Sequence, residues 1–410
     1  MLILYFVIRR LFGMLTGFCT AFIALFSYRD ILLMLWGHWP ERIAFYLLPV
    51  ALYLFYQYTE KFLHGDAQLS KKNIYLYLLS AVLALTLFFH PIGFFHSIAA
   101  LIAYAILLLI NIRRLPFSIL DVGRAGILFI ILIALFPYQT GNVFFRAKDE
   151  GSAVGVGQWD RLFSWYKQPD TYVGFPDWYF DYSQTSGGYW TIPFIILGIA
   201  YCLLKRENKH LMMIGWLVGL YALLHLEIIG KGRGFRSLSA SWHLFAPLAA
   251  LGMLSIPSYF KIAEKKKQIS RGILVVIFCI AVLSFNYAPA VKLLTDSYPP
   301  PVRLTDDQIA MADWISENTP EDAGIATVGM LTQAKSRWLW MVAKRVTVWP
   351  GKPVEGIDPY YVLFDYSDAV LQGQSVVDQV RQAEEQVKTQ GQLVFTQNNL
   401  KLYQAIEEKQ

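Results

Sequence analysis

The stretch FFHSIAALIAYAILLLINIRR, residues 94–114, decides the class of fold. Its first nineteen residues contain no Asp, Glu, Lys or Arg, and the basic pair Arg113-Arg114 follows at once. A helix that crosses a bilayer needs roughly 20 mostly apolar residues, and basic residues gather at its cytoplasmic end. We therefore expect residues 94–112 to form a membrane-spanning helix.

Similar stretches recur through residues 1–288 and predict an α-helical polytopic membrane domain. The 410-residue chain is 55% hydrophobic and 16% charged, whereas soluble domains carry roughly 25% charged residues. Long uncharged runs alternate with short clusters of Lys and Arg, and they predict about nine transmembrane helices. The runs are Leu11–Tyr28, Ile43–Tyr58, Ile74–Phe89, Phe94–Ile112, Ala125–Tyr138, Tyr189–Leu204, Leu211–Leu226, Leu238–Ile256 and Gly272–Tyr287. Only HPIG, residues 90–93, separates the third run from the fourth, which favours a tight hairpin over one long bent helix.

The distribution of basic residues predicts the orientation of these helices. With a cytoplasmic N-terminus, sixteen Lys and Arg residues fall on the cytoplasmic side and nine fall outside, the long external loop included. Because cytoplasmic connections are enriched in basic residues, this asymmetry predicts a cytoplasmic N-terminus and an external C-terminus. The expected location is the plasma (inner) membrane.

The composition argues against other classes of protein. The net charge of +6 does not indicate a nucleic-acid partner, because the basic residues lie at helix ends and form no patch interleaved with aromatic residues. Cys19, Cys202 and Cys279 each lie inside an apolar run, and no pair of them indicates a disulfide or a metal site. The expected surroundings of residues 1–288 are therefore lipid.

Two further segments are expected outside the cell. A loop at 139–188 is rich in Trp and Tyr, which argues for packing at the membrane surface rather than disorder. Residues 289–410 read as a small soluble α/β domain. Thr305-x-x-Gln308 is a capping-box helix start, and Asn318-Thr319-Pro320 ends that helix. Strands are expected at Gly324–Val328, Val346–Trp349 and Tyr361–Tyr366, a helix through Val376–Val387, and a hairpin that turns at Asn398-Asn399.

The amino terminus is unusual. Residues Met1–Ile8 are apolar but too short to cross a bilayer, and they precede Arg9-Arg10, whereas a secretory signal places its charges first. We interpret this segment as the tail of a further helix, with an interfacial segment as the alternative.

The strongest candidate binding residues are Lys231, Arg233 and Arg236. They lie in KGRGFR, residues 231–236, on the predicted external side, against the cytoplasmic bias of the other basic clusters. Cations bind phosphate through charge-assisted hydrogen bonds, and the glycines allow close approach of the backbone. The segment predicts a site for a lipid-linked phosphate; ordinary headgroup contact is the alternative.

Catalytic residues are harder to identify, because the sequence has no phosphate-binding Gly loop, HExxH or GxSxG motif. The candidates are Asp30 and Glu41 in the first external loop and His90 at a helix start. A solvated loop acid is the alternative for the carboxylates, and a hydrogen-bonded helix break is the alternative for His90. Further polar residues near predicted external ends are His38, His96, Asp160, Asp177, Asp181, His225 and Glu227.

Several segments resemble the C-type fold (GT-C) membrane glycosyltransferases. These are RRLFG at 9–13, FSYR at 26–29, WPER at 39–42, His90-Pro91, and DWISENTPEDA at 313–323. The resemblance implies an enzyme that moves a sugar from a polyprenyl-phosphate carrier on the external face. It also allows a divalent metal ion as cofactor, but metal dependence does not follow from the sequence. In that superfamily the catalytic Asp or Glu precedes the region matched here. The resemblance therefore implies a separate polypeptide that supplies the front part, a fragment, or a non-catalytic relative.

Three hypotheses for function remain open. The first is a glycosyltransferase-related membrane protein that handles a polyprenyl-phosphate-linked sugar and is incomplete as a catalyst alone, with a separate amino-terminal membrane subunit as its partner. The second is a non-catalytic scaffold or assembly subunit with an external docking domain. The third, a secondary transporter, is disfavoured because the sequence has no internal repeat. The sugar, the lipid carrier and the acceptor do not follow from the sequence.

Overall fold

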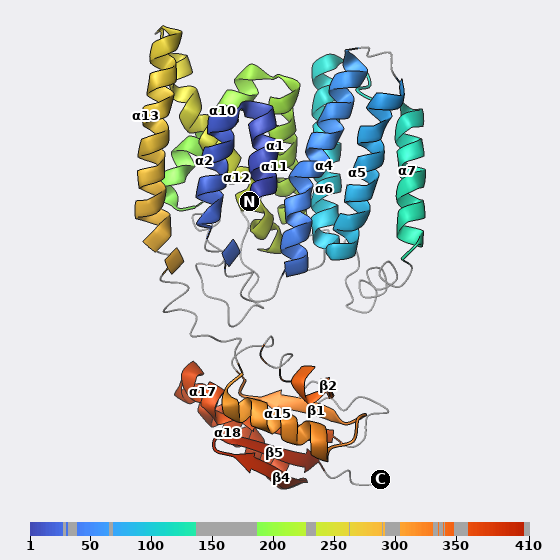
Figure 1. Cartoon of the computed structure of the whole chain (residues 1–410), viewed down its shortest axis with the longest axis vertical. Coiled ribbons are helices and arrows are strands. Elements are labelled where there is room, and N and C mark those ends of the chain that lie inside the picture. The colour runs from blue at the N-terminus through green and yellow to red at the C-terminus, as the bar shows by residue number, and fades with distance from the viewer. Residues whose placement is uncertain are drawn as a thin grey trace. The chain divides into compact units, whose positions relative to one another are not determined.

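The computed structural model describes residues 1–27, 30–31, 39–64, 69–136, 187–226, 235–261, 263–288, 290–291, 304–330, 335, 339, 341–347 and 360–405. The chain divides into two compact units, Met1–Leu293 and Leu294–Gln410. Figure 1 shows that the first unit is helical and that the second contains a sheet. The long loop predicted at 139–188 lies outside the described residues apart from its end.

The first unit is a bundle of helices. They are α1 (Leu2–Phe12), α2 (Met14–Leu25), α4 (Trp39–Leu63), α5 (Leu69–Phe89), α6 (Pro91–Ile112), α7 (Ile119–Ala134), α10 (Ile192–Lys205), α11 (Asn208–Leu226), α12 (Phe235–Ser255) and α13 (Glu264–Val282). A 3-10 turn at Tyr189–Thr191 precedes α10, another at Ile256–Tyr259 follows α12, and a π-helical turn at Leu283–Tyr287 extends α13. The predicted hairpin between α5 and α6 is confirmed, because the chain reverses at His90 and the two helices pack together.

The predicted first span, Leu11–Tyr28, is wrong. Gly13 has a φ of 95°, a left-handed value that glycine adopts readily, and it separates α1 from α2. The two helices pack against each other. The apolar segment at the amino terminus forms most of α1, which begins at Leu2. The apolar run continues across Gly13, and hydropathy alone therefore did not reveal the turn.

Two helices of the described part are long and apolar enough to cross a membrane, Pro91–Ile112 and Glu264–Tyr287. Three shorter apolar helices accompany them, Met14–Leu25, Asn73–Phe89 and Tyr189–Lys205. The number of nine spans therefore stays a prediction. The helices α7 and α13 lie at the two edges of the unit (Figure 1), and both expose large apolar side chains. Ile127 and Ile130 on α7 are 60% and 61% exposed, and Ile273 and Val276 on α13 are 56% and 59% exposed.

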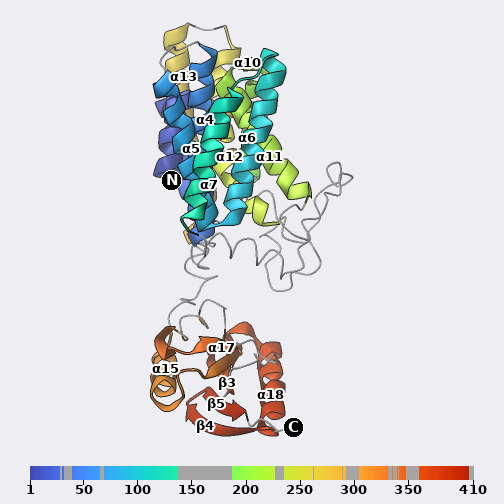
Figure 2. The ribbon, with the colours of Figure 1, turned by 90° about the vertical axis from the view of Figure 1, so that its right-hand side faces the viewer.

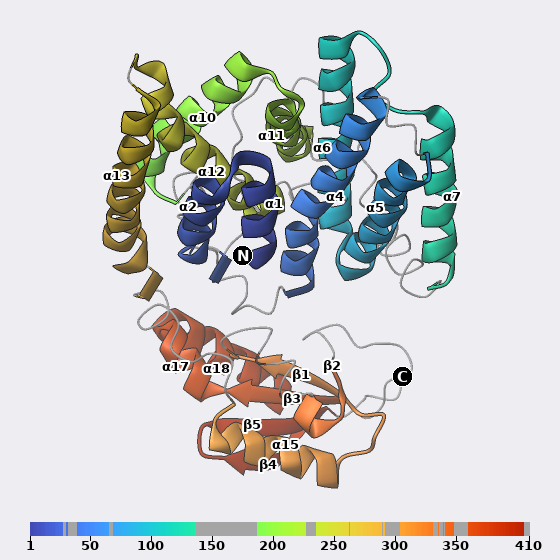
Figure 3. The same cartoon turned by 45° about the horizontal axis from the view of Figure 1, so that its top comes forward.

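Small residues bring the inner helices together. A Cβ atom at Gly252 of α12 would lie 1.9 Å from the carbonyl oxygen of Phe194 on α10, and one at Gly198 would lie 2.1 Å from that of Leu248. Glycine therefore permits the close contact between α10 and α12 seen in Figure 3. Close approach at small residues is how helices associate in lipid, where burial of apolar surface provides little driving force.

The second unit is a five-stranded mixed sheet with helices on both faces. Its strands are β1 (Gly324–Val328), β2 (Val346–Thr347), β3 (Tyr360–Asp365), β4 (Gly391–Gln397) and β5 (Leu400–Ala405), in the order β2-β1-β3-β5-β4. The first three are parallel, and β5 pairs antiparallel with β3 and β4. The helices are α15 (Asp306–Asn318), α17 (Tyr366–Gln372) and α18 (Gln374–Lys388).

Alternation along β3 explains the two layers. Leu363 packs in the cluster that includes Met311 of α15, whereas Val362 and Phe364 pack in the cluster that includes Val380 of α18. Successive side chains of a strand point to opposite faces, so the continuous apolar run serves both helices. Figure 2 shows α15 and α18 on opposite sides of the sheet.

Most predicted elements of this unit are confirmed. The capping box of Thr305 and Gln308 begins α15, Thr319 ends it, and Asn398 in the hairpin turn has a left-handed φ of 49°. The third strand differs by one residue at each end, because Asp365 caps a helix that the sequence did not predict. The Asp365 carboxylate accepts a hydrogen bond of 2.9 Å from the backbone N–H of Asp368, and α17 starts there. Trp349 of the predicted second strand lies outside the described residues.

Glu384 of α18 is the centre of an ionised cluster in the second unit. It is 1% exposed, and its carboxylate accepts hydrogen bonds from Tyr403 at 2.6 Å, from Lys401 at 2.9 Å and from Tyr366. Burial opposes ionisation of Glu384, but these hydrogen bonds outweigh it and lower the pKa of Glu384 to about 2. The cluster therefore joins α18 to β5 through an ionised carboxylate.

Candidate functional site

The starts of several helices meet in the first unit. Glu41 and Arg42 lie in the first turn of α4, His96 follows the start of α6 by five residues, and His243 follows the start of α12 by eight. A Cβ atom at Gly93 would lie 2.5 Å from the Cβ of Ala44, so the starts of α6 and α4 are in contact. Because each helix carries a positive partial charge at its amino end, this region favours anions.

Asp30 is the centre of an ion-paired cluster at these helix starts. Its carboxylate contacts the Arg42 guanidinium, and its Oδ2 lies 3.3 Å from Nε2 of His243. Tyr46 donates a hydrogen bond of 3.5 Å to the same oxygen, and the Ser27 hydroxyl accepts one of 3.3 Å from the backbone N–H of Asp30. Asp30 is 4% exposed, and Arg42 and His243 are each 1% exposed. A buried charge is stable only with such partners.

Glu41 and His96 extend the cluster, and the Phe45 ring lies near His96 and His243. Glu41 is 2% exposed and His96 1% exposed, and the Glu41 charge is close enough to act on the His96 ring. The Phe45 ring meets the His96 ring edge-on, with the ring centroids 5.4 Å apart. The centroids of the Phe45 and His243 rings are 6.5 Å apart. We refer to Asp30, Glu41, Arg42, His96 and His243 together as the buried polar cluster.

The structure brings two of the three predicted catalytic candidates into this cluster. Asp30 and Glu41 belong to it and are not solvated loop acids. His90 does not: its Nδ1 accepts a hydrogen bond of 3.3 Å from the backbone N–H of Ile92, which caps α6. The alternative interpretation of His90, a hydrogen-bonded helix break, therefore agrees with the structure.

Of the three predicted phosphate-binding residues, only Arg236 lies in a described element. Lys231 and Arg233 lie outside the described residues, and Arg236 is the second residue of α12, with its side chain outside the description. The candidates His38, Asp160, Asp177, Asp181 and Glu227 also lie outside it. His225 is described, and its ring stacks on Tyr221 at 4.2 Å.

Sequence reasoning missed Arg42 and His243. Arg42 was counted among external loop charges, although it directly follows Glu41. The sequence did contain a signal for His243. Burying a histidine in lipid costs free energy, so a histidine within the apolar run 238–256 indicates a functional or paired residue. Nδ1 of His243 is buried and has no hydrogen-bond partner among the described residues, which is rare for a buried polar atom.

The described residues provide no set of ligands for the divalent metal ion that the family resemblance allows. Among the described residues, no group of three or more His, Cys, Asp and Glu side chains is arranged to hold a metal ion. Asp30, the central carboxylate, is already paired with Arg42. We therefore derive no step through a metal ion.

Comparisons with known proteins bear on the fold. Two structures of an archaeal oligosaccharyltransferase from Archaeoglobus fulgidus match the chain. One is tethered with an acceptor peptide containing the NVT sequon, with a TM-score of 0.47, 14% identity, and coverage of 100% of this chain and 62% of that one. The other is AglB in complex with an inhibitory peptide and a dolichol-phosphate. Its TM-score is 0.48 and its sequence identity is 13%, and the match covers 99% of this chain and 62% of that one. The chain thus spans less than two thirds of their length. The chain is similar to part of each of these proteins.

No curated protein matches the chain in sequence. The sequence model of one protein family matches residues 1–351, which is most of the chain. The chain therefore belongs to DUF6541, a family of unknown function.

Proposed function

We propose that the chain is a multi-pass membrane protein that binds a polyprenyl-phosphate-linked sugar beside the buried polar cluster and takes part in glycosyl transfer there. The observation that carries this proposal is the position of α12. Its first two residues, Phe235 and Arg236, belong to the basic segment 231–236, and two turns later it places His243 beside Asp30. A phosphate held at this helix start lies two turns, roughly 12 Å, from His243, so the sugar attached to it can reach the buried polar cluster.

The helical unit fits a bilayer. Its edge helices expose isoleucine and valine, and soluble proteins rarely leave such faces uncovered. We place about nine spans in the membrane, with the basic connections in the cytoplasm and the second unit outside. We infer one change to the predicted orientation from the contacts of α1. Met1 contacts Tyr46 beside the cluster, whereas Arg9 and Arg10 lie at the other end of α1. If Arg9 and Arg10 are cytoplasmic, Met1 belongs to the external end.

The proposed phosphate site combines two sources of positive charge. The amino end of α12 offers backbone N–H groups and the helix dipole, and Lys231, Arg233 and Arg236 add three cations. Within the cluster, Arg42 already balances Asp30. We therefore assign the incoming phosphate to the cations of segment 231–236.

The groups of the cluster suit different tasks. Asp30 is paired with a guanidinium, so we assign it an electrostatic role rather than proton transfer. His243 has a buried ring nitrogen with no hydrogen-bond partner in the described part of the chain, and we assign it contact with the ligand. A catalytic carboxylate from a second polypeptide, as the family resemblance implies, stays a prediction.

Binding of a polyprenyl phosphate by the purified full chain in detergent tests this proposal. Phosphatidylglycerol serves as the anionic control lipid. Arg236→Gln and Lys231→Gln are compared with Lys265→Gln, an exposed lysine of α13 far from α12's start in sequence. Each of the first two variants should weaken polyprenyl-phosphate binding roughly tenfold or more, because a charge-assisted hydrogen bond contributes about 1.5–3 kcal/mol. The control should bind as the wild type does. If polyprenyl phosphate binds no better than phosphatidylglycerol, the segment is a membrane anchor and the scaffold hypothesis is favoured.

A further inference from the structure

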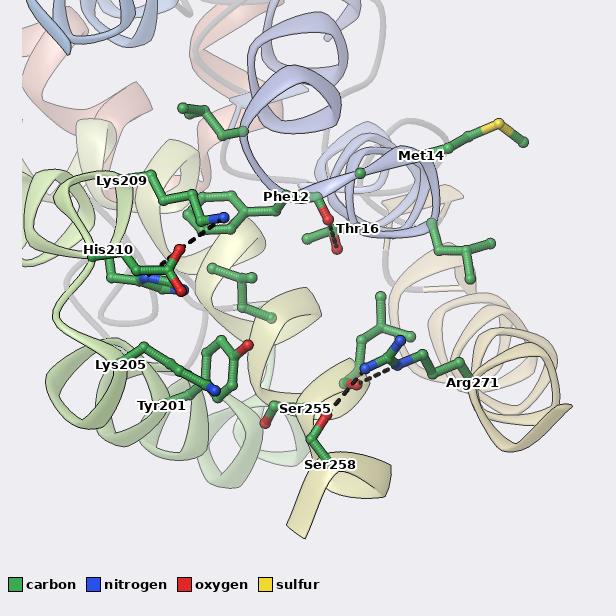
Figure 4. Close-up of a pocket in the computed structure, with 16 residues that line it drawn as sticks. Phe12, Met14, Thr16, Tyr201, Lys205, Lys209, His210, Ser255, Ser258 and Arg271 are labelled. Carbon is green, nitrogen blue, oxygen red and sulfur yellow. Dashed lines mark hydrogen bonds and ion pairs between the residues drawn. The ribbon is translucent and has the colours of Figure 1, made fainter. Parts of the chain in front are cut away.

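We propose a second anion site in the helical unit, a cavity that binds a phosphate group at the basic end of the bundle. It is independent of the buried polar cluster. The cavity has a volume of about 410 Å³. Its walls come from the turn between α1 and α2, the connection between α10 and α11, the end of α12 and the first half of α13. Figure 4 shows the residues that line it.

Two helix starts form part of the wall. Gly13, Met14, Leu15 and Thr16 line the cavity and make up the turn and the first residues of α2. The first intrahelical hydrogen bond of α2 is donated by Gly17 to Gly13 at 3.1 Å, and no side chain caps this helix. The preceding backbone N–H groups therefore have no acceptor within α2 and suit an anion. The first residues of α11, Lys209 and His210, line the opposite wall.

The charges on the cavity wall are unbalanced. Lys205, Lys209 and Arg271 face a single carboxylate, that of Glu207, which lies 3.0 Å from Nζ of Lys209. Arg271 is held in place by hydrogen bonds to the Ser258 hydroxyl at 3.0 Å and to a backbone carbonyl at 3.3 Å. Figure 4 shows these cations on different sides of the cavity. Cations that surround a space with one acid leave a net attraction for an anion.

His210 gives independent support for a ligand. It lines the cavity and is 2% exposed, and its Nδ1 has no hydrogen-bond partner among the described residues. The carboxylate oxygen Oε2 of Glu207 lies 3.8 Å from Nδ1 of His210, too far for a hydrogen bond. A buried polar atom without a partner costs free energy, and a phosphate oxygen or hydroxyl in the cavity removes that cost.

Apolar neighbours indicate where the phosphate comes from. Met14 and Leu15 are 63% and 39% exposed at the rim, and Leu251 and Leu254 line the interior. Such a site accepts the headgroup of an anionic phospholipid while its acyl chains stay among apolar side chains. Free inorganic phosphate shares the same headgroup chemistry, so both sources require a direct test.

The test measures binding to the full chain in a neutral detergent. The probes are short-chain phosphatidic acid, phosphatidylcholine of the same chain length, and inorganic phosphate. The variants are Arg271→Gln, Lys209→Gln and Lys205→Gln, with Lys265→Gln as the control because it lies on α13 but does not line the cavity. Lys205 is exposed, so its loss should leave the fold intact even where another variant disturbs it.

We expect phosphatidic acid to bind roughly tenfold or more tightly than phosphatidylcholine, and each cavity variant to lose roughly tenfold in affinity. Binding of inorganic phosphate with the same sensitivity to the variants also supports the site and identifies free phosphate as its ligand. The proposal is overturned if neither probe is preferred over phosphatidylcholine, or if Lys265→Gln weakens binding as much as Lys205→Gln. Binding of polyprenyl phosphate near α12 remains a separate measurement, so either proposal can fail alone.

Discussion

Removal of one partner of the Asp30–Arg42 pair should strongly destabilise the helical unit, and removal of both should not. Asp30 is 4% exposed and Arg42 is 1% exposed, so removal of either one leaves a buried charge that has lost this ion-pair partner. Breaking a buried pair in this way costs about 3–5 kcal/mol. We therefore expect Arg42→Gln and Asp30→Asn each to lower the free energy of unfolding by that amount. The double variant keeps two neutral hydrogen-bonding groups and should lose about 1–2 kcal/mol.

A double-mutant cycle measures this coupling. The full chain is unfolded by denaturant in detergent, and tryptophan fluorescence follows the transition. Arg124→Gln is the matched control, because Arg124 is 60% exposed and lies 3.8 Å from Asp121. Because Arg124 is exposed, although Asp121 is buried, water screens this pair and it contributes about 0–1 kcal/mol. If the losses of the two single variants simply add in the double variant, Asp30 and Arg42 do not interact, and the buried polar cluster is not organised as described.

Two more predictions concern the second unit and the membrane orientation. The pKa of Glu384, lowered to about 2 from the ordinary 4.5, stabilises the fold above pH 4.5, and this contribution is lost as the pH falls from 4.5 towards 2. Hydrogen exchange of β5 follows the acid unfolding of the second unit. The stability of the wild type should therefore fall steeply with pH in that window, and the stability of Glu384→Gln should depend less on pH there. Equal pH profiles would contradict the ionised cluster. A reporter active only outside the cytoplasm should be active when fused after Gln410 and silent when fused after Lys267, and the reverse pattern would contradict the orientation.

The sequence predicted the second unit well because its signals are local. The capping box at Thr305, the asparagine turn at Asn398 and the continuous apolar run of β3 each depend on a few neighbouring residues. The missed helix α17 has a local cause too, but Asp365 was read as strand because the apolar residues before it continue to Phe364. Apolar content places a strand, whereas the side chain of a single cap decides where it ends.

The first unit was harder, because hydropathy reports environment and not packing. Glycine has one meaning at Gly13, where the chain turns with a φ of 95°, and another at Gly252, where α10 approaches closely. Both glycines lie within apolar sequence. The pairing of Asp30 with His243 joins residues more than two hundred positions apart, and neither neighbourhood in sequence contains the other's signal. Such a cluster depends on which helices meet, and that is set by the whole bundle.

The two proposed sites differ in where their positive charge comes from. At the buried polar cluster the helix starts attract anions, but the chain supplies its own carboxylates there, and Arg42 is engaged by Asp30. A phosphate therefore needs the added cations of segment 231–236. At the basic cavity, three cations face Glu207 alone, and the uncapped start of α2 adds backbone donors. It follows that neutralising segment 231–236 should abolish phosphate binding at the first site and leave the second unchanged, because the second has its counter-charges built into its own walls.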